Sequence, residues 1–242
     1  MDSTGVGGVM TLPESPDAFS EATWDDVHPF YEELAARPLD AGNVEDWLAD
    51  WSRFESLLSE ASALASFEYS CNTADPDRES AQLRFGTEIS PKAQEQRVRL
   101  QERLVELGYV RAGLETTIER FRNQMRIFNE ANVPLSAELS RLTTKWSKLI
   151  SAMTVEWDGV EKTPSQLLPY LEAPDRSVRE RAFKLRAQPY IEQRDAIADI
   201  FDTMYDLRQQ TARNAGFGNF RDYAHQEKNR FSYTPADCMR FH

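Results

Sequence analysis

The sequence is short of the side chains that bind metals and form disulfides: its 242 residues include three histidines and two cysteines. Cys71 and Cys238 lie far apart and lack metal-site spacing, which indicates two free thiols, with one long-range disulfide as the alternative. The zinc-peptidase motif His-Glu-x-x-His needs two histidines four residues apart. His28 is followed by proline, His225 by glutamine, and His242 by no residue. We therefore assign no catalytic residue and no metal ligand to this sequence, and its substrate-binding residues stay unknown. The lone His225 is interpreted as a surface or packing residue.

Excess positive charge and long apolar runs are also missing. There are 28 Lys and Arg residues against 40 Asp and Glu, so the formal net charge is −12. Nucleic acids and anionic membranes both attract clustered positive charge, so neither is an expected partner. No apolar stretch reaches the roughly 18 residues of a membrane span. The segment Met1–Met10 lacks the basic and apolar regions of a signal peptide, and we expect a cytoplasmic protein.

Phosphate-binding glycine loops and the Gly-x-Ser-x-Gly nucleophile elbow are absent as well. With 10 glycines and 12 prolines, the chain favours long helices over a turn-rich β sandwich, and 40% hydrophobic residues suffice for a sizeable core. The expected fold is mainly α. Apolar periodicity and helix-start residues predict helices at about 24–34, 43–65, 75–107 with a break at Pro91, 114–129, 136–153, 175–215 and 220–228, with further helix starts at Thr163 and Thr234.

Particular residues refine these predicted helices. Trp47, Trp51 and Phe54 form a stripe at helical spacing, which is typical of core packing and not of a ligand site. Gly108 and Gly216 are expected to end their helices in the left-handed conformation. The arginines 97, 99 and 103 alternate with glutamates, which predicts a solvated face of salt bridges. The segment 175–215 is expected to be two helices bent near Pro189.

One segment changes from helical to alternating periodicity. Residues 154–163 alternate β-prone and polar side chains around Asp158-Gly159. Asp-Gly tolerates the positive φ of a two-residue hairpin turn, so a small β-hairpin is predicted here. The expected organisation is a flexible tail at 1–20, a helical region at 21–153, and the hairpin followed by further helices at 154–242.

The last residues predict a helix start without a helix end. Thr234, Pro235 and Asp237 have the order of a capping residue, a first helical position and a first-turn acid. The chain stops about two turns later, without a capping glycine or a polar tail. This pattern leads us to expect a piece of a longer protein.

Several segments, taken in order, resemble oligoendopeptidase F and its thimet oligopeptidase-like relatives, in the N-terminal portion only. They are 157–159 in the hairpin, 168–171 (LPYL), 174–183 (PDRSVRERAF), 207–217 (LRQQTARNAGF), 219–223 (NFRDY) and 230–237 (RFSYTPAD). The resemblance covers about residue 20 to the end and implies a mainly α lobe. It identifies 154–242 as the hairpin plus the start of the catalytic-domain helices.

The resemblance also implies an activity. Proteins of this family are zinc metallopeptidases with two helical lobes around a channel that admits short peptides. Their zinc is held by His-Glu-x-x-His and a downstream Glu, and none of these residues can be carried onto this sequence. The resemblance thus implies an N-terminal fragment that binds no zinc and is inactive alone, with short peptides and the missing C-terminal catalytic portion as partners. The alternative is a standalone helical scaffold or binding module without enzyme activity.

Overall fold

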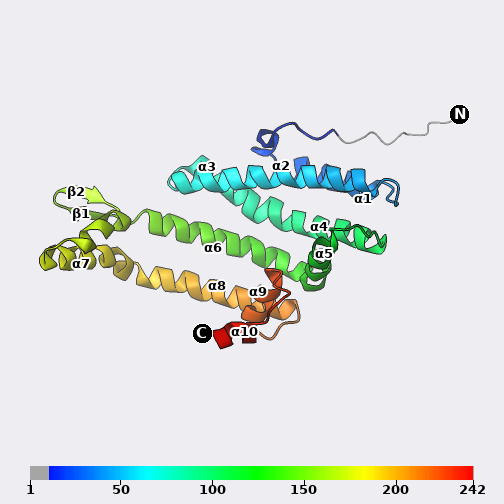
Figure 1. The fold of residues 1–242 in the computed structure, drawn as a ribbon. Coiled ribbons are helices and arrows are strands. Elements are labelled where there is room, and N and C mark those ends of the chain that lie inside the picture. Colours follow the sequence, from blue (N-terminus) through cyan, green and yellow to red (C-terminus); the bar gives the residue numbers. More distant parts are fainter. Residues whose placement is uncertain (1–10, 242) are drawn as a thin grey trace.

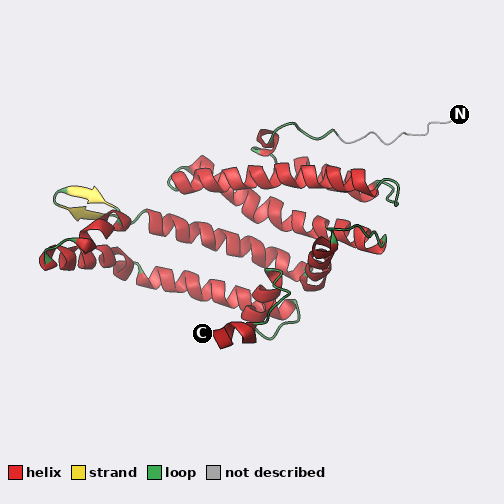
Figure 2. Ribbon diagram, in the orientation of Figure 1, coloured by secondary structure: helices red, strands yellow, loops and turns green. Residues whose placement is uncertain are grey.

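The computed structural model describes residues 11–241; Met1–Met10 and His242, for which expectations were given above, lie outside them. Mainly helical architecture is confirmed, with one small antiparallel hairpin (Figures 1 and 2). The elements are η1 (Pro16–Phe19), α1 (Trp24–Ala36), α2 (Val44–Cys71), α3 (Pro76–Arg84), η2 (Phe85–Ile89), α4 (Ser90–Glu106), α5 (Glu115–Ile127), η3 (Glu130–Asn132), α6 (Val133–Ser151), β1 (Val155–Trp157), β2 (Val160–Lys162), η4 (Pro164–Glu172), α7 (Arg176–Glu192), α8 (Arg194–Asn214), α9 (Phe220–Glu227) and α10 (Pro235–Phe241).

The helices form a layered, elongated body (Figure 1). Helices α1 to α4 lie together along one side, and α6 and α8 run antiparallel beside them. The hairpin, η4 and α7 gather at one end, whereas α5, α9 and α10 gather at the other. The two ends of α8 are therefore attached to different parts of the molecule.

The aromatic stripe of α2 is core, as predicted. Trp47 and Phe54 are fully buried and Trp51 nearly so. The Trp47 indole nitrogen donates to the backbone oxygen of Leu34, 2.9 Å away on α1. Because a buried indole N–H needs an acceptor, this bond fixes how α1 crosses α2.

The predicted tail at 1–20 extends too far. Residues Pro16–Phe19 form a 3₁₀ helix that Ser15 caps through the backbone nitrogen of Asp17. Phe19 is only 2% exposed and its ring packs edge-on against Phe54, 6.0 Å between centroids. An aromatic side chain buried in the main core anchors this segment.

The predicted break at Pro91 is wrong. Helix α3 passes through a π-helical turn, η2, directly into α4, and Pro91 lies in the first turn of α4. Proline lacks the backbone N–H that a helix uses for hydrogen bonding, and this lack costs less in the first turn of a helix than in its interior. The wider π turn before it accommodates the proline ring. Gly86 of η2 lies against α6, where a Cβ added to it would lie 2.0 Å from the Ser140 hydroxyl oxygen.

Helix α6 begins earlier than predicted. The predicted helix started at about residue 136, but Val133 opens α6 and Pro134 lies in its first turn. Proline is suited to that position because its fixed φ matches the helix. Trp146, whose spacing on this helix is that of an inward-facing residue, is 45% exposed.

The predicted hairpin is confirmed. Trp157 pairs with Val160 across the turn, and Asp158 and Gly159 have φ of 53° and 77°. The Trp157 ring is buried between Tyr170, 4.5 Å away between centroids, and the Arg181 guanidinium, 4.3 Å from the ring. These contacts attach the hairpin to η4 and α7.

The long C-terminal helical segment is two helices, as predicted. They meet at Gln193, four residues beyond Pro189. Gly216 ends α8 with φ of 81° and Gly108 follows α4 with φ of 66°, both in the left-handed conformation predicted for them. Phe201 and Ile191 belong to the apolar positions of these helices, yet they are 61% and 62% exposed.

Candidate functional site

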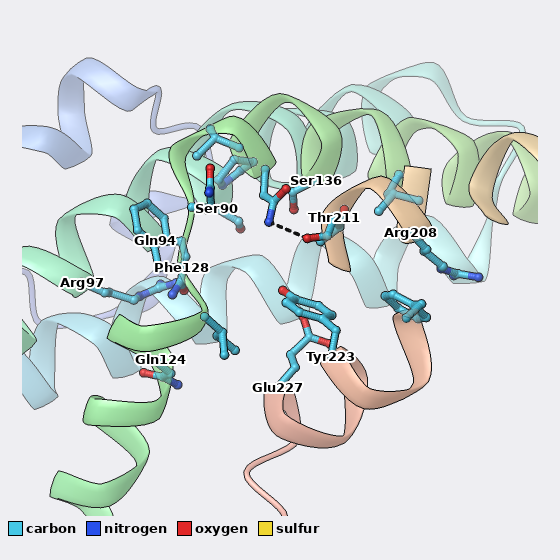
Figure 3. A pocket seen from close by; sticks show the side chains of 17 residues that line it. Ser90, Gln94, Arg97, Gln124, Phe128, Ser136, Arg208, Thr211, Tyr223 and Glu227 are labelled. Carbon is cyan, nitrogen blue, oxygen red and sulfur yellow. Dashed lines mark hydrogen bonds between the residues drawn. The ribbon is translucent and has the colours of Figure 1, made fainter. Parts of the chain in front are cut away.

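The candidate site is a cavity of about 570 Å³ where α4, α5, α6, α8 and α9 meet (Figure 3). Helix α4, from the group α1 to α4, lies on one side of the cavity, and α6 and α8 lie on the other, so only the folded chain forms it. Its lining is Ser90, Pro91, Gln94, Arg97, Gln124, Ile127, Phe128, Asn129, Asn132, Val133, Ser136, Leu139, Arg208, Thr211, Phe220, Tyr223 and Glu227. Pockets of this size occur in ligand-binding proteins, with mixed apolar and polar walls like these.

Asparagines hold one wall in place. The Asn129 amide donates to the backbone oxygen of Asn214 at 2.6 Å, and the Asn132 amide donates to that of Thr211 at 3.1 Å, the bond drawn in Figure 3. The Asn214 amide donates to Asn132 Oδ1 at 2.8 Å. The last carbonyls of a helix have no partner within the helix. The α5–α6 connection thus caps the C-terminal end of α8.

A charged network supports the α4 wall. Arg97 points toward the cavity (Figure 3) and its guanidinium binds both carboxylate oxygens of Glu55 on α2. The same carboxylate accepts from the Tyr31 hydroxyl at 2.9 Å and the Trp51 indole at 3.2 Å. Burial raises the pKa of Tyr31 far above its ordinary value, so this hydroxyl stays a donor. The prediction that Arg97 lies on a solvated face of salt bridges is wrong, because Arg97 is part of this half-buried network.

The opposite wall comes from α8 and α9. The Tyr223 hydroxyl donates to Glu227 at 3.3 Å, and the Arg208 guanidinium lies 5.8 Å from the ring centroid of Phe220. Burial raises the pKa of Tyr223, and the nearby Glu227 carboxylate acts in the same direction. Tyr223 is therefore a neutral donor at any physiological pH.

The cavity offers hydrogen-bonding groups from several helices. Gln94, Ser90 and Ser136 present amide and hydroxyl groups, which exchange hydrogen bonds with neutral polar ligands. No lining residue is a cysteine or histidine that could act with a neighbouring base. Within residues 11–241, no three His, Cys, Asp or Glu side chains come together as a metal site.

The two described histidines lie apart from this cavity. His28 lies 3.3 Å from Glu32 on the same helix. His225 is 6% exposed and packs edge-on against Tyr233, as the packing interpretation predicted. Cys71 and Cys238 are free thiols. No helix in the described range is long and apolar enough to cross a membrane.

Sequence reasoning missed the lining residues. Asn129 lies at the predicted end of a helix and Asn132 in the connection that follows it, and asparagine commonly satisfies free backbone groups at such boundaries. Gln94 and Gln124 carry no sequence signal, because only the tertiary fold brings α4 and α5 to α8.

Comparison with known proteins finds similarity to one peptidase family. Residues 16–127 match the family model described as the Peptidase M3 N-terminal domain. This part of the chain is thus similar to an oligoendopeptidase N-terminal domain, which confirms the predicted family resemblance in the N-terminal portion. No curated protein matches the chain.

Solved structures share the fold beyond that domain. A protein assigned as oligoendopeptidase F from Bacillus anthracis str. Ames is 15% identical, with a TM-score of 0.83 over 91% of this chain and 42% of its own. A second protein assigned as oligoendopeptidase F is 18% identical, with a TM-score of 0.81 over 89% of this chain and 39% of its own. PZ peptidase A, solved with an inhibitor, is 18% identical, with a TM-score of 0.79 over 96% of this chain and 41% of its own. The chain spans about two fifths of the length of these three proteins.

Proposed function

We propose that this chain provides the N-terminal lobe of a zinc-dependent oligoendopeptidase that hydrolyses short peptides. The observation that carries the proposal is the fold shared with an oligoendopeptidase F over 91% of this chain at a TM-score of 0.83. The Peptidase M3 match over 16–127 supports the same assignment independently of the fold comparison. A standalone helical scaffold is the alternative, and no feature of the described residues favours it.

The described residues do not fit a zinc ion, since none of their His, Cys, Asp and Glu side chains form a ligand group of three. We therefore derive no catalytic step from them. In the proposal, the ligands of a His-Glu-x-x-His motif and its water-activating glutamate come from sequence outside these 242 residues. The 242-residue chain is inactive alone, and its partners are that catalytic portion and short peptides, in the cytoplasm.

Two surfaces support a role as one lobe of a larger enzyme. Phe201 and Tyr205 lie one turn apart on α8 and are 61% and 53% exposed, which suits a face covered by another lobe. The cavity with Gln94, Ser90 and Ser136 carries uncharged groups that can bond a peptide backbone.

The coding sequence downstream of His242 tests the proposal. An open frame that carries His-Glu-x-x-His supports it, whereas a stop codon directly after His242 contradicts it and favours the scaffold. The purified 242-residue chain, given zinc and a quenched fluorescent peptide, is expected to show no chelator-sensitive cleavage. Chelator-sensitive turnover by this chain would contradict the assignment of the metal site to other sequence.

A further inference from the structure

A second hollow, of about 380 Å³, lies between α5, α9 and the segment that leads into α10. Arg122 and Arg126 of α5 and Arg230 after α9 line it, against one carboxylate, that of Glu119. We call it the arginine depression. The chain as a whole carries a net charge of −12, so the charge is locally reversed here. Such a reversal favours an anionic ligand.

The three guanidiniums are not neutralised by the protein. Within residues 11–241, none of them forms an ion pair with a carboxylate. Arg126 donates only to the side-chain oxygens of Asn123 and Gln226, both at 2.8 Å. The Arg230 guanidinium lies 5.9 Å from the ring centroid of Tyr233. Their donors are therefore available to a ligand.

A buried histidine in the same wall lacks partners. His225 is 6% exposed, and neither ring nitrogen has a hydrogen-bond partner in the described part of the chain. Most buried polar groups in proteins are bonded, so an imidazole left without any partner requires an explanation. Tyr233 packs edge-on against its ring, 5.3 Å between centroids, on the side of the depression. The His225 side chain itself is part of the lining of the depression.

Hydrogen bonds join α5 to the end of α9 at the floor of the depression. The Asn123 amide donates to the backbone oxygen of Gln226 at 2.7 Å and to Asn229 Oδ1 at 3.0 Å. Asn229 has φ of 53°, which reverses the chain after α9, and the Arg230 backbone nitrogen then donates to the His225 oxygen at 3.4 Å. Arginines from two separate elements are thus held over one hollow.

We propose that the arginine depression binds a carboxylate, with the guanidiniums of Arg122 and Arg230 as the charged donors and the His225 imidazole as a further donor. The planar guanidinium matches a carboxylate with paired, charge-assisted hydrogen bonds. The Glu119 carboxylate in the lining disfavours a doubly charged anion. The inference does not rest on the proposed function, because it uses only this chain's own residues.

The carboxylate could be a peptide C-terminus or an acidic side chain, and three probes distinguish these sources. The 242-residue chain is titrated with N-acetyl-Ala-Ala as the free acid, with its C-terminal amide, with N-acetyl-Ala-Asp-Ala-amide and, for comparison, with inorganic phosphate. Binding is followed by calorimetry and by the imidazole NMR signals of His225. We expect saturable binding of at least one acid probe, a shift of the His225 signals, and no binding of the neutral amide. The acid probe that binds more tightly identifies the source. Failure of both acid probes to saturate, or tighter binding of inorganic phosphate, overturns the proposal.

Substitutions locate the site. Arg122→Gln and Arg230→Gln are each expected to weaken carboxylate binding at least about tenfold, since each removes a charge-assisted bond. Arg120→Gln is the matched control: Arg120 lies exposed on the same helix and outside the lining, so its loss should change affinity less than about twofold. Equal affinity of all three variants overturns the assignment. Because these side chains are exposed, the variants should melt like the parent chain.

Discussion

Arg97 and Glu55, 42 residues apart in sequence, meet side-on: the Arg97 Nε lies 3.0 and 2.9 Å from the two carboxylate oxygens, and its terminal nitrogen lies 2.8 Å from one of them. The pair joins α4 to α2. It also fixes the Tyr31 hydroxyl and the Trp51 indole, both of which donate to the same carboxylate. One ion pair and its hydrogen bonds therefore connect α1, α2 and α4.

Loss of this pair should be costly. Arg97→Met leaves a half-buried carboxylate without its cation, so we expect about 2–3 kcal/mol less stability in urea unfolding. Arg99→Met is the control, because the Arg99–Glu32 pair is about half exposed and should contribute less than about 1 kcal/mol. Similar urea midpoints for Arg97→Met and Arg99→Met would contradict a larger contribution of the Arg97–Glu55 pair to stability.

Gly86→Ala should destabilise the contact between η2 and α6. The new Cβ would lie 2.0 Å from the Ser140 hydroxyl oxygen and 3.2 Å from its Cβ, so the helices must separate or Ser140 must rotate. We expect a loss of about 1–2 kcal/mol in urea unfolding. In a Ser140→Gly background the same change should cost much less, which a double-mutant cycle measures. Gly218→Ala, which meets nothing within 4 Å, is the matched control.

Stability should fall in acid because of the helix caps. Backbone and side-chain hydrogen bonds from Thr23 lower the pKa of Asp26, as those from Ser177 do for Asp175. A carboxyl with a lower pKa in the folded state stabilises the fold above its unfolded pKa of about 3.9, and this contribution is lost as pH falls through the folded pKa. Melting temperatures from pH 6 to 3 should therefore fall less steeply for Asp26→Asn/Asp175→Asn. The neighbouring exposed Asp25→Asn should keep the parent slope, and identical slopes for all three proteins would exclude the caps as the cause.

The apolar face of α8 should drive self-association. Phe201 and Tyr205 are more than half exposed and lie one turn apart, so they form one patch. Phe201→Gln/Tyr205→Gln should shift association, followed by light scattering after size exclusion, to higher protein concentration without lowering the melting temperature. Val110→Gln removes a lone apolar side chain, 87% exposed, elsewhere and should leave association unchanged. A parent chain that stays monomeric at high concentration would contradict the prediction.

Features governed by local chemistry could be predicted from the sequence. The Asp158-Gly159 turn, the Thr163 helix start and the glycine at 216 each depend on residues within one or two turns of the chain. Backbone conformation and capping bonds decide them, and both can be inferred from a short segment.

Features that depend on residues far away in the sequence could not be predicted. Arg97 belongs to an alternating run of charges that is typical of a solvated helix face, and only the approach of α2 makes it part of a network. Trp146 has the spacing of a core residue on α6, yet no helix in the described range covers it fully. The cavity and the arginine depression likewise need five and three elements brought together by the fold.

The π-helical turn at Phe85–Ile89 determines which way all of α4 faces. A π turn holds one more residue than an α turn, so every later side chain is rotated about 100° around the helix axis relative to an uninterrupted helix. With that offset α3 packs on α2 and α6, and α4 packs on α1, α5 and α6. Removal of a single residue from this turn would close it to an ordinary α turn and leave Leu100 and Leu104 facing the core, whereas the present sequence as an unbroken α-helix would rotate both away from it.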